Sequence, residues 1–298
     1  MSEQKKNGIP QMGPDTGNYW CTWDTQFRVN SVEDGKDTKN LRNVLTQDFL
    51  FAEDGMLRNY LKNVRQDLYV LLDDGWDVGK DVPGNGAVSV FGSLVLDSDK
   101  FPDFTGEPWE RLTKLRCKLI ELGYRGLGLW ICANATGEEE AHPLSVEEAE
   151  NYWKERAIWC RKAGVDYWKV DWGYHCGDAA YREMTTRIVK QYAPDLKIEH
   201  AVCRGPLDEK VEHWKRVGKL LSISDYVRTY DVVKEFTYST TIARTWEMFD
   251  QDRKVQFGCR GIPNIEDAPL LAAGLCCSMG VMRHLLGRHR NRRPGFWT

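Results

Sequence analysis

A lysine and an aspartate stand two residues apart in the aromatic-rich stretch DYWKVDWG, as Lys169 and Asp171. Because side chains alternate along a strand, both are expected on one face, opposite Trp168 and Trp172. A nearby ammonium group favours the ionised form of a carboxyl, so we expect Lys169 to hold the pKa of Asp171 low. An ionised carboxylate in a dry pocket suits a nucleophile. The alternative is a buried ion pair with a purely structural role.

A second carboxylate, Asp231, follows Arg228 by three residues in another strand-like segment. Two carboxylates that flank a sugar can break a glycosidic bond, one as nucleophile and the other as acid/base. Asp171 and Asp231 form a candidate pair for this chemistry, with carboxyl groups expected about 5–5.5 Å apart. Arg228 could bind a substrate oxygen beside them. The alternative role for Asp231 is to cap the helix that follows.

Two adjacent acids, Asp73 and Asp74, follow an apolar segment. Neighbouring carboxylates repel each other unless something satisfies them, and sugar hydroxyls do so because each ionised carboxylate accepts several hydrogen bonds. A divalent metal ion is the alternative ligand, but no third metal ligand stands nearby in the sequence. A turn or cap role is the remaining alternative. Hydroxyl recognition is the favoured interpretation.

These residues fall on a regular alternation of strand-like and helix-like segments, which predicts βαβ units and a parallel sheet. Eight repeats in 298 residues fit an α/β fold of the (β/α)8 type, a TIM barrel, with a doubly wound open sheet as the alternative. Strands are expected at 18–24, 68–77, 125–133, 166–173, 197–203, 225–232, 254–259 and 281–284, and helices at 49–66, 109–123, 145–164, 178–194, 208–222, 236–250 and 266–280. Barrel active sites lie at the carboxyl ends of the strands, where the candidate acids stand.

The barrel is expected to span residues 1–285. An eighth helix should follow the last strand, but residues 286–298 form a basic tail instead. We therefore expect this tail to be disordered or truncated, with the eighth helix missing.

Composition narrows the classes of partner. The net charge of −3 creates no strong field for nucleic acid or membrane surfaces. No apolar run is long enough for a membrane span or a signal peptide, which favours a cytoplasmic location. The nine cysteines include no CxxC pair and no zinc spacing, so neither a metal nor another cofactor is expected. The sequence does not indicate an oligomeric state.

Six segments, taken together and in order, resemble the α-galactosidase (melibiase) clan of glycoside hydrolases, which includes α-N-acetylgalactosaminidases and raffinose-synthase-type enzymes. They are IPQMGPDTGNYWCTWDT (9–25), LLDDGW (71–76), GSLVLDSDKFPDF (92–104), GLGLWICA (126–133), KVDWG (169–173) and RTYD (228–231). A seventh, CRGPL (203–207), stands where the clan's fifth strand ends. The resemblance covers most of the chain.

The resemblance implies a retaining mechanism, with Asp171 as nucleophile and Asp231 as general acid/base. It implies a sugar subsite formed by Trp23, Asp73, Asp74, Lys169 and Arg228, with Trp130 at a position that is usually aromatic. Cys203 and Arg204 occupy the position that reads the substituent at the sugar's second carbon. The resemblance also implies a C-terminal β-sandwich domain, which we expect to be missing here.

The favoured function is therefore a retaining α-glycosidase, most naturally an α-galactosidase, with a carbohydrate as partner. A raffinose-synthase-type transglycosylase would use the same residues. A lyase that forms a Schiff base on Lys169 is a second class, although Asp171 beside it would keep the amine protonated. A catalytically impaired carbohydrate-binding relic is a third.

Overall fold

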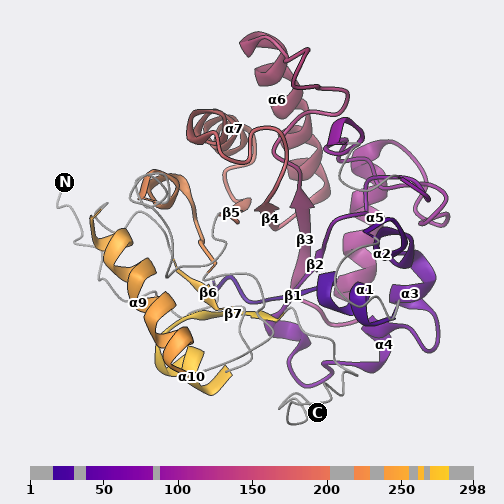
Figure 1. Ribbon diagram of the computed structural model, residues 1–298. Coiled ribbons are helices and arrows are strands. Elements are labelled where there is room, and N and C mark those ends of the chain that lie inside the picture. The colour runs from indigo at the N-terminus through magenta and orange to yellow at the C-terminus, as the bar shows by residue number, and fades with distance from the viewer. Residues whose placement is uncertain are drawn as a thin grey trace.

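The computed structural model describes residues 16–29, 38–82, 88–201, 218–228, 238–254, 261–264 and 269–281. These residues form a parallel sheet of seven strands in the order β5-β4-β3-β2-β1-β7-β6 (Figure 1). The strands are β1 (Tyr19–Cys21), β2 (Tyr69–Leu72), β3 (Gly126–Ile131), β4 (Tyr167–Val170), β5 (Lys197–His200), β6 (Pro263–Asn264) and β7 (Ser278–Val281). The predicted parallel α/β sheet is confirmed.

The sheet curls, and two isolated parallel bridges extend it beyond β5. Tyr226 pairs with Glu199 on one side and with Gly261, just before β6, on the other. Backbone pairing therefore runs from β5 through Tyr226 to β6, and from there through β7 to β1. This sequential order belongs to a partial or complete (β/α)8 barrel, whereas a doubly wound sheet reverses its order at a switch point.

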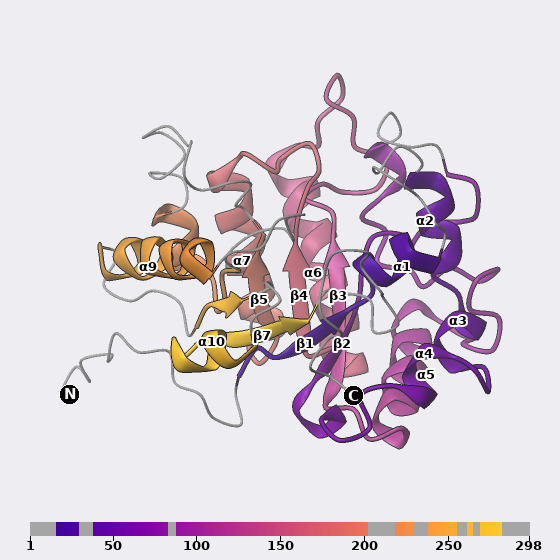
Figure 2. The same ribbon diagram turned by 60° about the horizontal axis from the view of Figure 1, so that its bottom comes forward.

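Helices cover the outside of the curled sheet (Figures 1 and 2). In the described ranges they are α1 (Trp23–Val29), α2 (Thr38–Val44), α3 (Gln47–Phe51), α4 (Met56–Asn59), α5 (Pro108–Glu121), α6 (Val146–Ala163), α7 (Ala179–Tyr192), α9 (Tyr238–Lys254) and α10 (Pro269–Gly274), with short 3-10 turns at Arg65–Asp67 and Val88–Val90. Residues 218–223 are also helical. Helix α6 contacts both α5 and α7. These three helices pack on the strands that carry the candidate site.

The ends of α6 follow the signals in its sequence. Ser145 and Glu148 form the predicted capping box, in which each side chain accepts a hydrogen bond from the other's backbone N–H. Gly164 ends the helix with a left-handed φ of 71°, a conformation that costs glycine little. The chain then turns directly into β4.

Four tyrosines fill the inside of the curled sheet below the candidate site. The ring of Tyr167 lies 5.6 Å from Tyr19, 5.8 Å from Tyr69 and 5.7 Å from Tyr226, measured between centroids. Tyr167 and Lys169 share a face of β4 because side chains alternate. Lys169 therefore stands one layer above the tyrosines, toward the carboxyl ends of the strands.

Several predicted boundaries are wrong. The first strand ends at Cys21, and Trp23 already begins α1. The helix expected over 49–66 is divided into two short helices: α3, which Thr46 caps, and α4, which begins after Gly55. The helix expected over 266–280 ends at Gly274, since residues 278–281 belong to β7.

The second half of the chain departs further from the predicted pattern. Of the described residues in the strand expected over 225–232, Tyr226 alone forms β-bridges, although the N–H groups of Asp225 and Val227 also donate to neighbouring backbone. In the strand expected over 254–259, residue 254 ends α9 and the others lie outside the described residues. Residues 282–298 also lie outside them, and with them the expectations for the basic tail and the eighth helix.

Candidate functional site

Lys169, on β4, joins the two carboxylates predicted around it. Its Nζ atom lies 2.7 Å from Oδ2 of Asp73, directly after β2, and 3.8 Å from Oδ2 of Asp171, directly after β4. Lys169 is 1% exposed. Strands β2 and β4 flank β3, so one ammonium group spans the width of three strands. The structure thus brings together the two halves of the site that stand almost a hundred residues apart in the sequence.

Asp171 is the carboxylate of this group that reaches solvent, with a side chain 21% exposed. The indole N–H of Trp130 on β3 donates to its Oδ2 at 3.2 Å, and Nη2 of Arg228 lies 3.7 Å from its Oδ1. Burial opposes ionisation of Asp171, but the charges of Arg228 and Lys169 and the indole hydrogen bond outweigh it and lower the pKa. Asp171 thus lies among groups that favour its ionised form, as the Lys169 spacing led us to expect, but it is partly exposed and not enclosed in a dry pocket.

The amine of Lys169 is held in its charged form. Burial acts to lower its pKa, but the negative charge of Asp73 outweighs this and raises the pKa above the ordinary value. Schiff-base formation needs a neutral amine, and reactive lysines have depressed pKa values. This environment is the opposite of the one that a Lys169 lyase requires.

Asp73 is held from several directions. Its Oδ2 accepts a hydrogen bond from the Cys21 thiol at 2.9 Å in addition to the one from Lys169, and its backbone N–H donates to Thr22 Oγ1 at 2.9 Å. Burial and the nearby Asp73 charge raise the pKa of the Cys21 thiol well above its usual range. Cys21 therefore remains a thiol donor that orients Asp73.

Asp74 turns away from Lys169 toward Arg42 on α2. Arg42 donates from Nε to Oδ1 at 2.8 Å and from Nη2 to Oδ2 at 2.9 Å, a bidentate pair. Burial raises the pKa of Asp74 to about 6 in spite of this pairing. Arg42 also lies over the ring of Phe91 at 4.4 Å and that of Trp172 at 5.7 Å. The repulsion predicted between the adjacent acids is thus relieved by two different cations.

Aromatic side chains line the region beside Asp171. The Trp172 ring lies 5.3 Å from Trp130 and 5.0 Å from Phe91, between centroids. Trp23 is half-buried at the start of α1, beyond the end of β1, and packs on the main hydrophobic core. Trp130 and Trp23 therefore both lie at the carboxyl end of the sheet, as predicted.

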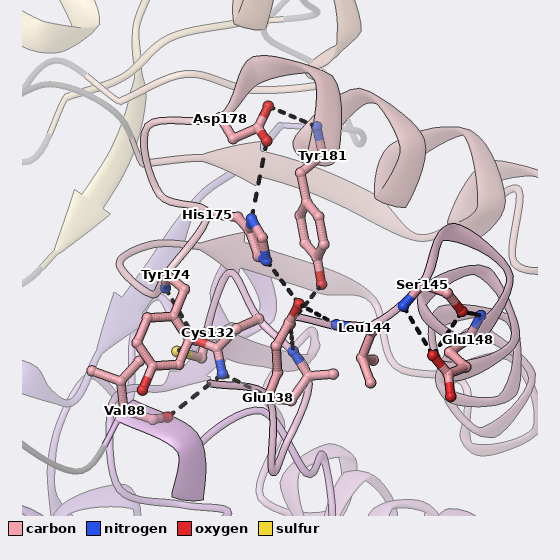
Figure 3. A network of polar contacts seen from close by, with 12 residues as sticks. Val88, Cys132, Glu138, Leu144, Ser145, Glu148, Tyr174, His175, Asp178 and Tyr181 are labelled. Carbon is pink, nitrogen blue, oxygen red and sulfur yellow. Dashed lines mark hydrogen bonds and ion pairs between the residues drawn. The ribbon is translucent and has the colours of Figure 1, made fainter. Parts of the chain in front are cut away.

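The loops after β3 and β4 are joined by a polar network that the sequence did not reveal (Figure 3). Oε1 of the buried Glu138 lies 2.9 Å from Nε2 of His175, and its Oε2 accepts a hydrogen bond from the Tyr181 hydroxyl at 3.5 Å. The rings of His175 and Tyr181 stack with centroids 3.8 Å apart. Asp178 lies 4.0 Å from Nδ1 of the same histidine. This network holds in place the loop that begins at Asp171.

Gly173 lets the same two loops approach closely. Its φ is +146°, and a Cβ atom there would stand 2.6 Å from Oδ1 of Asn134 and 2.7 Å from the backbone nitrogen of Ala133. A side chain at position 173 would force the loops apart. The glycine after the KVDW stretch is thus required by the packing around Asp171.

Three predicted site residues, Cys203, Arg204 and Asp231, lie outside the described residues. The distance between Asp171 and Asp231, and the roles of all three, therefore stay predictions. Among the described side chains, no three His, Cys, Asp or Glu residues gather as a metal site would require. Every described helix is too short or too polar to cross a lipid bilayer.

No family model matches the sequence, and no curated protein matches it. Among solved structures, the chain is similar to a β-L-arabinopyranosidase of family GH27 from Geobacillus stearothermophilus, with 15% identity over 83% of this chain and 60% of that one and a TM-score of 0.47. It is also similar to a homocysteine methyltransferase from Escherichia coli, with 10% identity over 91% and 92% and a TM-score of 0.46. A third likeness is to the carboxyl transferase domain of Rhizobium etli pyruvate carboxylase, with 13% identity over 85% and 40% and a TM-score of 0.42.

The chain thus spans 60% of the length of the arabinopyranosidase. The three similar proteins differ in their chemistry, and the identities and TM-scores are low. The likenesses concern the general arrangement of strands and helices, and they do not bear on the activity of this chain.

Proposed function

We propose that the protein is a retaining α-glycosidase that acts on terminal galactose-type sugars, with Asp171 as its nucleophile. One observation carries the proposal: the partly exposed Asp171 carboxylate lies at a strand end beside Lys169, Arg228 and the Trp130 indole. These groups stabilise its charge without covering it. The GLGLWICA, KVDWG and RTYD motifs supply Trp130, Lys169 with Asp171, and Arg228 in the order of the α-galactosidase clan.

The reaction is a double displacement. An oxygen of Asp171 attacks the anomeric carbon, and the bond from that carbon to the leaving-group oxygen breaks while a general acid protonates that oxygen. Water then cleaves the resulting glycosyl ester. The residue that acted as the general acid now acts as a base and deprotonates this water. We assign the acid/base role to Asp231, on the strength of the RTYD motif.

The remaining residues would bind the sugar. Asp73 and Asp74 would accept hydrogen bonds from hydroxyls, and Lys169 and Arg228 would donate to sugar oxygens. Trp23 and Trp130 would supply aromatic surface. Cys203 and Arg204 would contact the substituent at the second carbon, which sets the class of sugar.

A screen of aryl α- and β-glycosides tests the proposal, with the anomeric configuration of the first product followed by NMR. We expect hydrolysis of aryl α-galactosides with retention, lost in Asp171→Asn and kept in the matched control Asp195→Asn, which changes an exposed aspartate at a loop. Inversion, or full activity in Asp171→Asn, contradicts the proposal. Transfer to an added sugar in place of water would identify a transglycosylase with the same nucleophile.

A further inference from the structure

Arg182 on α7 donates hydrogen bonds to the backbone on both sides of the Asp171 side chain. It is 1% exposed, so its guanidinium is enclosed by protein. Its Nη1 donates to the carbonyl of Val170 at 3.0 Å, and its Nη2 donates to the carbonyl of Asp171 itself. Its Nε donates to the carbonyl of Cys176 at 3.0 Å. One side chain thus joins the beginning of the β4–α7 loop to its end.

These contacts replace a sheet ladder that stops short. Strand β4 ends at Val170, and within the described part of the chain no strand backbone donates to the carbonyl of Asp171. The Asp171 N–H donates to the carbonyl of Ile131 at 2.9 Å, and the carbonyl of Trp172 accepts from Ala133 at 2.8 Å. With Arg182 added, the peptide groups on both sides of the Asp171 Cα are hydrogen-bonded, which fixes the direction of its side chain.

The guanidinium is itself held by a buried histidine. Nη1 of Arg182 lies 3.1 Å from Nδ1 of His200, which must accept because the guanidinium can only donate. The other ring nitrogen lies 2.9 Å from Thr186 Oγ1, whose hydroxyl donates to the backbone carbonyl of Arg182 at 2.8 Å. His200 therefore carries its proton on Nε2 and is neutral. Burial and the charge of Arg182 lower the pKa of His200 well below its usual value, which agrees with this tautomer.

We propose that Arg182 is a positioning residue for the glycosidase reaction: through the carbonyls of Val170, Asp171 and Cys176 it fixes the backbone from which the nucleophile extends, and it places a permanent positive charge behind that nucleophile. The proposal rests on the function proposed above. Arg182 acts through Asp171 and touches no reacting atom. Its charge adds to those of Arg228 and Lys169, which stand nearer to the carboxylate.

Two substitutions separate the geometric part from the charge. Arg182→Lys keeps a charge but cannot span three carbonyls, so we expect kcat to fall about 10-fold with little change in the acid limb of the pH profile. Arg182→Met removes both, so we expect kcat to fall on the order of 100-fold and the pKa of Asp171 to rise by up to about one unit. Arg187→Met is the matched control, since Arg187 lies on the same helix, 59% exposed, and pairs with Glu150.

The pKa of Asp171 is measured by carbon-13 NMR of its carboxyl group, assigned with Asp171→Asn, in all variants. This measurement needs no turnover, so it tests the inference even if wild-type protein hydrolyses no glycoside and the proposed function fails. A folded Arg182→Met with the same Asp171 pKa as Arg187→Met, and the same kcat where activity exists, overturns the proposal.

A variant that does not fold still leaves a test. If Arg182→Met is unfolded, Arg182→Lys serves as the test. A kcat and an Asp171 carboxyl chemical shift that are both unchanged in Arg182→Lys contradict the proposal. If neither folds, Thr186→Val removes the hydroxyl that holds His200 against Arg182, and we expect kcat to fall a few-fold with KM unchanged. A Thr186→Val protein identical to wild type in kcat and in the Asp171 carboxyl signal overturns it.

Discussion

Two buried cations meet the acids of this site in different ways. Lys169 is a single ammonium group shared between Asp73 at 2.7 Å and Asp171 at 3.8 Å. Arg42 donates two hydrogen bonds to one partner, the carboxylate of Asp74, at 2.8 and 2.9 Å. Both cations are 1% exposed, but the Lys169 group includes the 21% exposed Asp171, whereas Asp74 is 2% exposed.

The difference distinguishes an arrangement that suits chemistry, around Lys169, from one that suits a structural role, around Arg42. The bidentate Arg42–Asp74 pair uses both carboxylate oxygens and ties α2 to the end of β2, which suits a structural role. The Lys169 group leaves Asp171 open to solvent and charged, which suits chemistry. If Asp74 also accepts a sugar hydroxyl, as the sequence predicts, it does so while paired to Arg42. Four predictions test this contrast.

The largest expected effect is that of Asp171→Asn. The amide keeps the shape but cannot form a glycosyl ester, so kcat should fall on the order of 1,000-fold or more. Asp171 lies at the open end of the group, so the urea midpoint should change little. Initial rates on an aryl α-galactoside and urea unfolding measure both. A large loss of stability with a small loss of activity would make Asp171 a structural acid.

Lys169→Met should lower kcat/KM on the order of 100-fold. Removing the ammonium group also raises the pKa of Asp171, so the acid limb of the pH profile should move to higher pH. Lys100→Met is the matched control, because Lys100 is as deeply buried but donates to the backbone carbonyls of Gly75 and Arg42. An acid limb that moves equally in both variants would contradict the assignment.

Arg42→Met should act mainly on stability. It leaves the buried Asp74 without its cation, and breaking such a pair costs about 3–5 kcal/mol. Urea unfolding measures this, with Arg187→Met as the control, whose exposed pair with Glu150 should cost below about 1 kcal/mol. The folded fraction of Arg42→Met should keep a kcat within about 10-fold of wild type. Equal losses of stability in the two variants would mean that the buried Arg42–Asp74 pair contributes no more than the exposed Arg187–Glu150 pair.

The smallest effect concerns His200. An unfolded histidine takes up a proton near pH 6.5, whereas burial and Arg182 keep the folded His200 neutral. Its stabilising contribution is therefore complete above about pH 6.5 and declines as pH falls, by at most about 1.4 kcal/mol per pH unit. Burial raises the pKa of Asp74 and Asp77 to about 6, which has the opposite effect: their contribution is complete below their unfolded pKa and is lost as pH rises through 6.

The readout is thus the difference between wild type and His200→Gln, in which the two aspartates cancel. Gln can accept from Arg182 and donate to Thr186 without titrating. Urea unfolding between pH 5 and 7.5 should show a stability difference that shifts in favour of His200→Gln as the pH falls. A difference independent of pH would mean that His200 takes up its proton with the same pKa in the folded and the unfolded protein, which contradicts a neutral, buried histidine.

The sequence predicted the first half of the fold better than the second. Strands β2 to β5 are runs of buried residues separated by long amphipathic helices, so their order and sides follow from periodicity alone. Strand β6 is two residues long, and Tyr226 pairs only through two isolated bridges, so neither segment has a period that a sequence can display. Their places are set by the neighbouring strands.

The candidate site follows the same rule. The spacing of Lys169 and Asp171 on β4 is local, and the structure confirms that the two lie together. Arg42 and Arg182 stand on helices, and only the folded chain brings their guanidinium groups to Asp74 and to the Asp171 carbonyl. Arginines on helices are common and usually face solvent, so nothing in the sequence marked these two as buried.

The most direct test of the central claim is to trap the covalent intermediate. An activated galactosyl fluoride that carries a second fluorine on its ring forms the glycosyl ester readily but slows its hydrolysis, so the labelled enzyme can be digested and sequenced by mass spectrometry. We predict one sugar per chain, on Asp171. A sugar on another carboxylate, or a borohydride-reducible adduct on Lys169 with carbonyl substrates, would contradict the assignment of Asp171 as nucleophile.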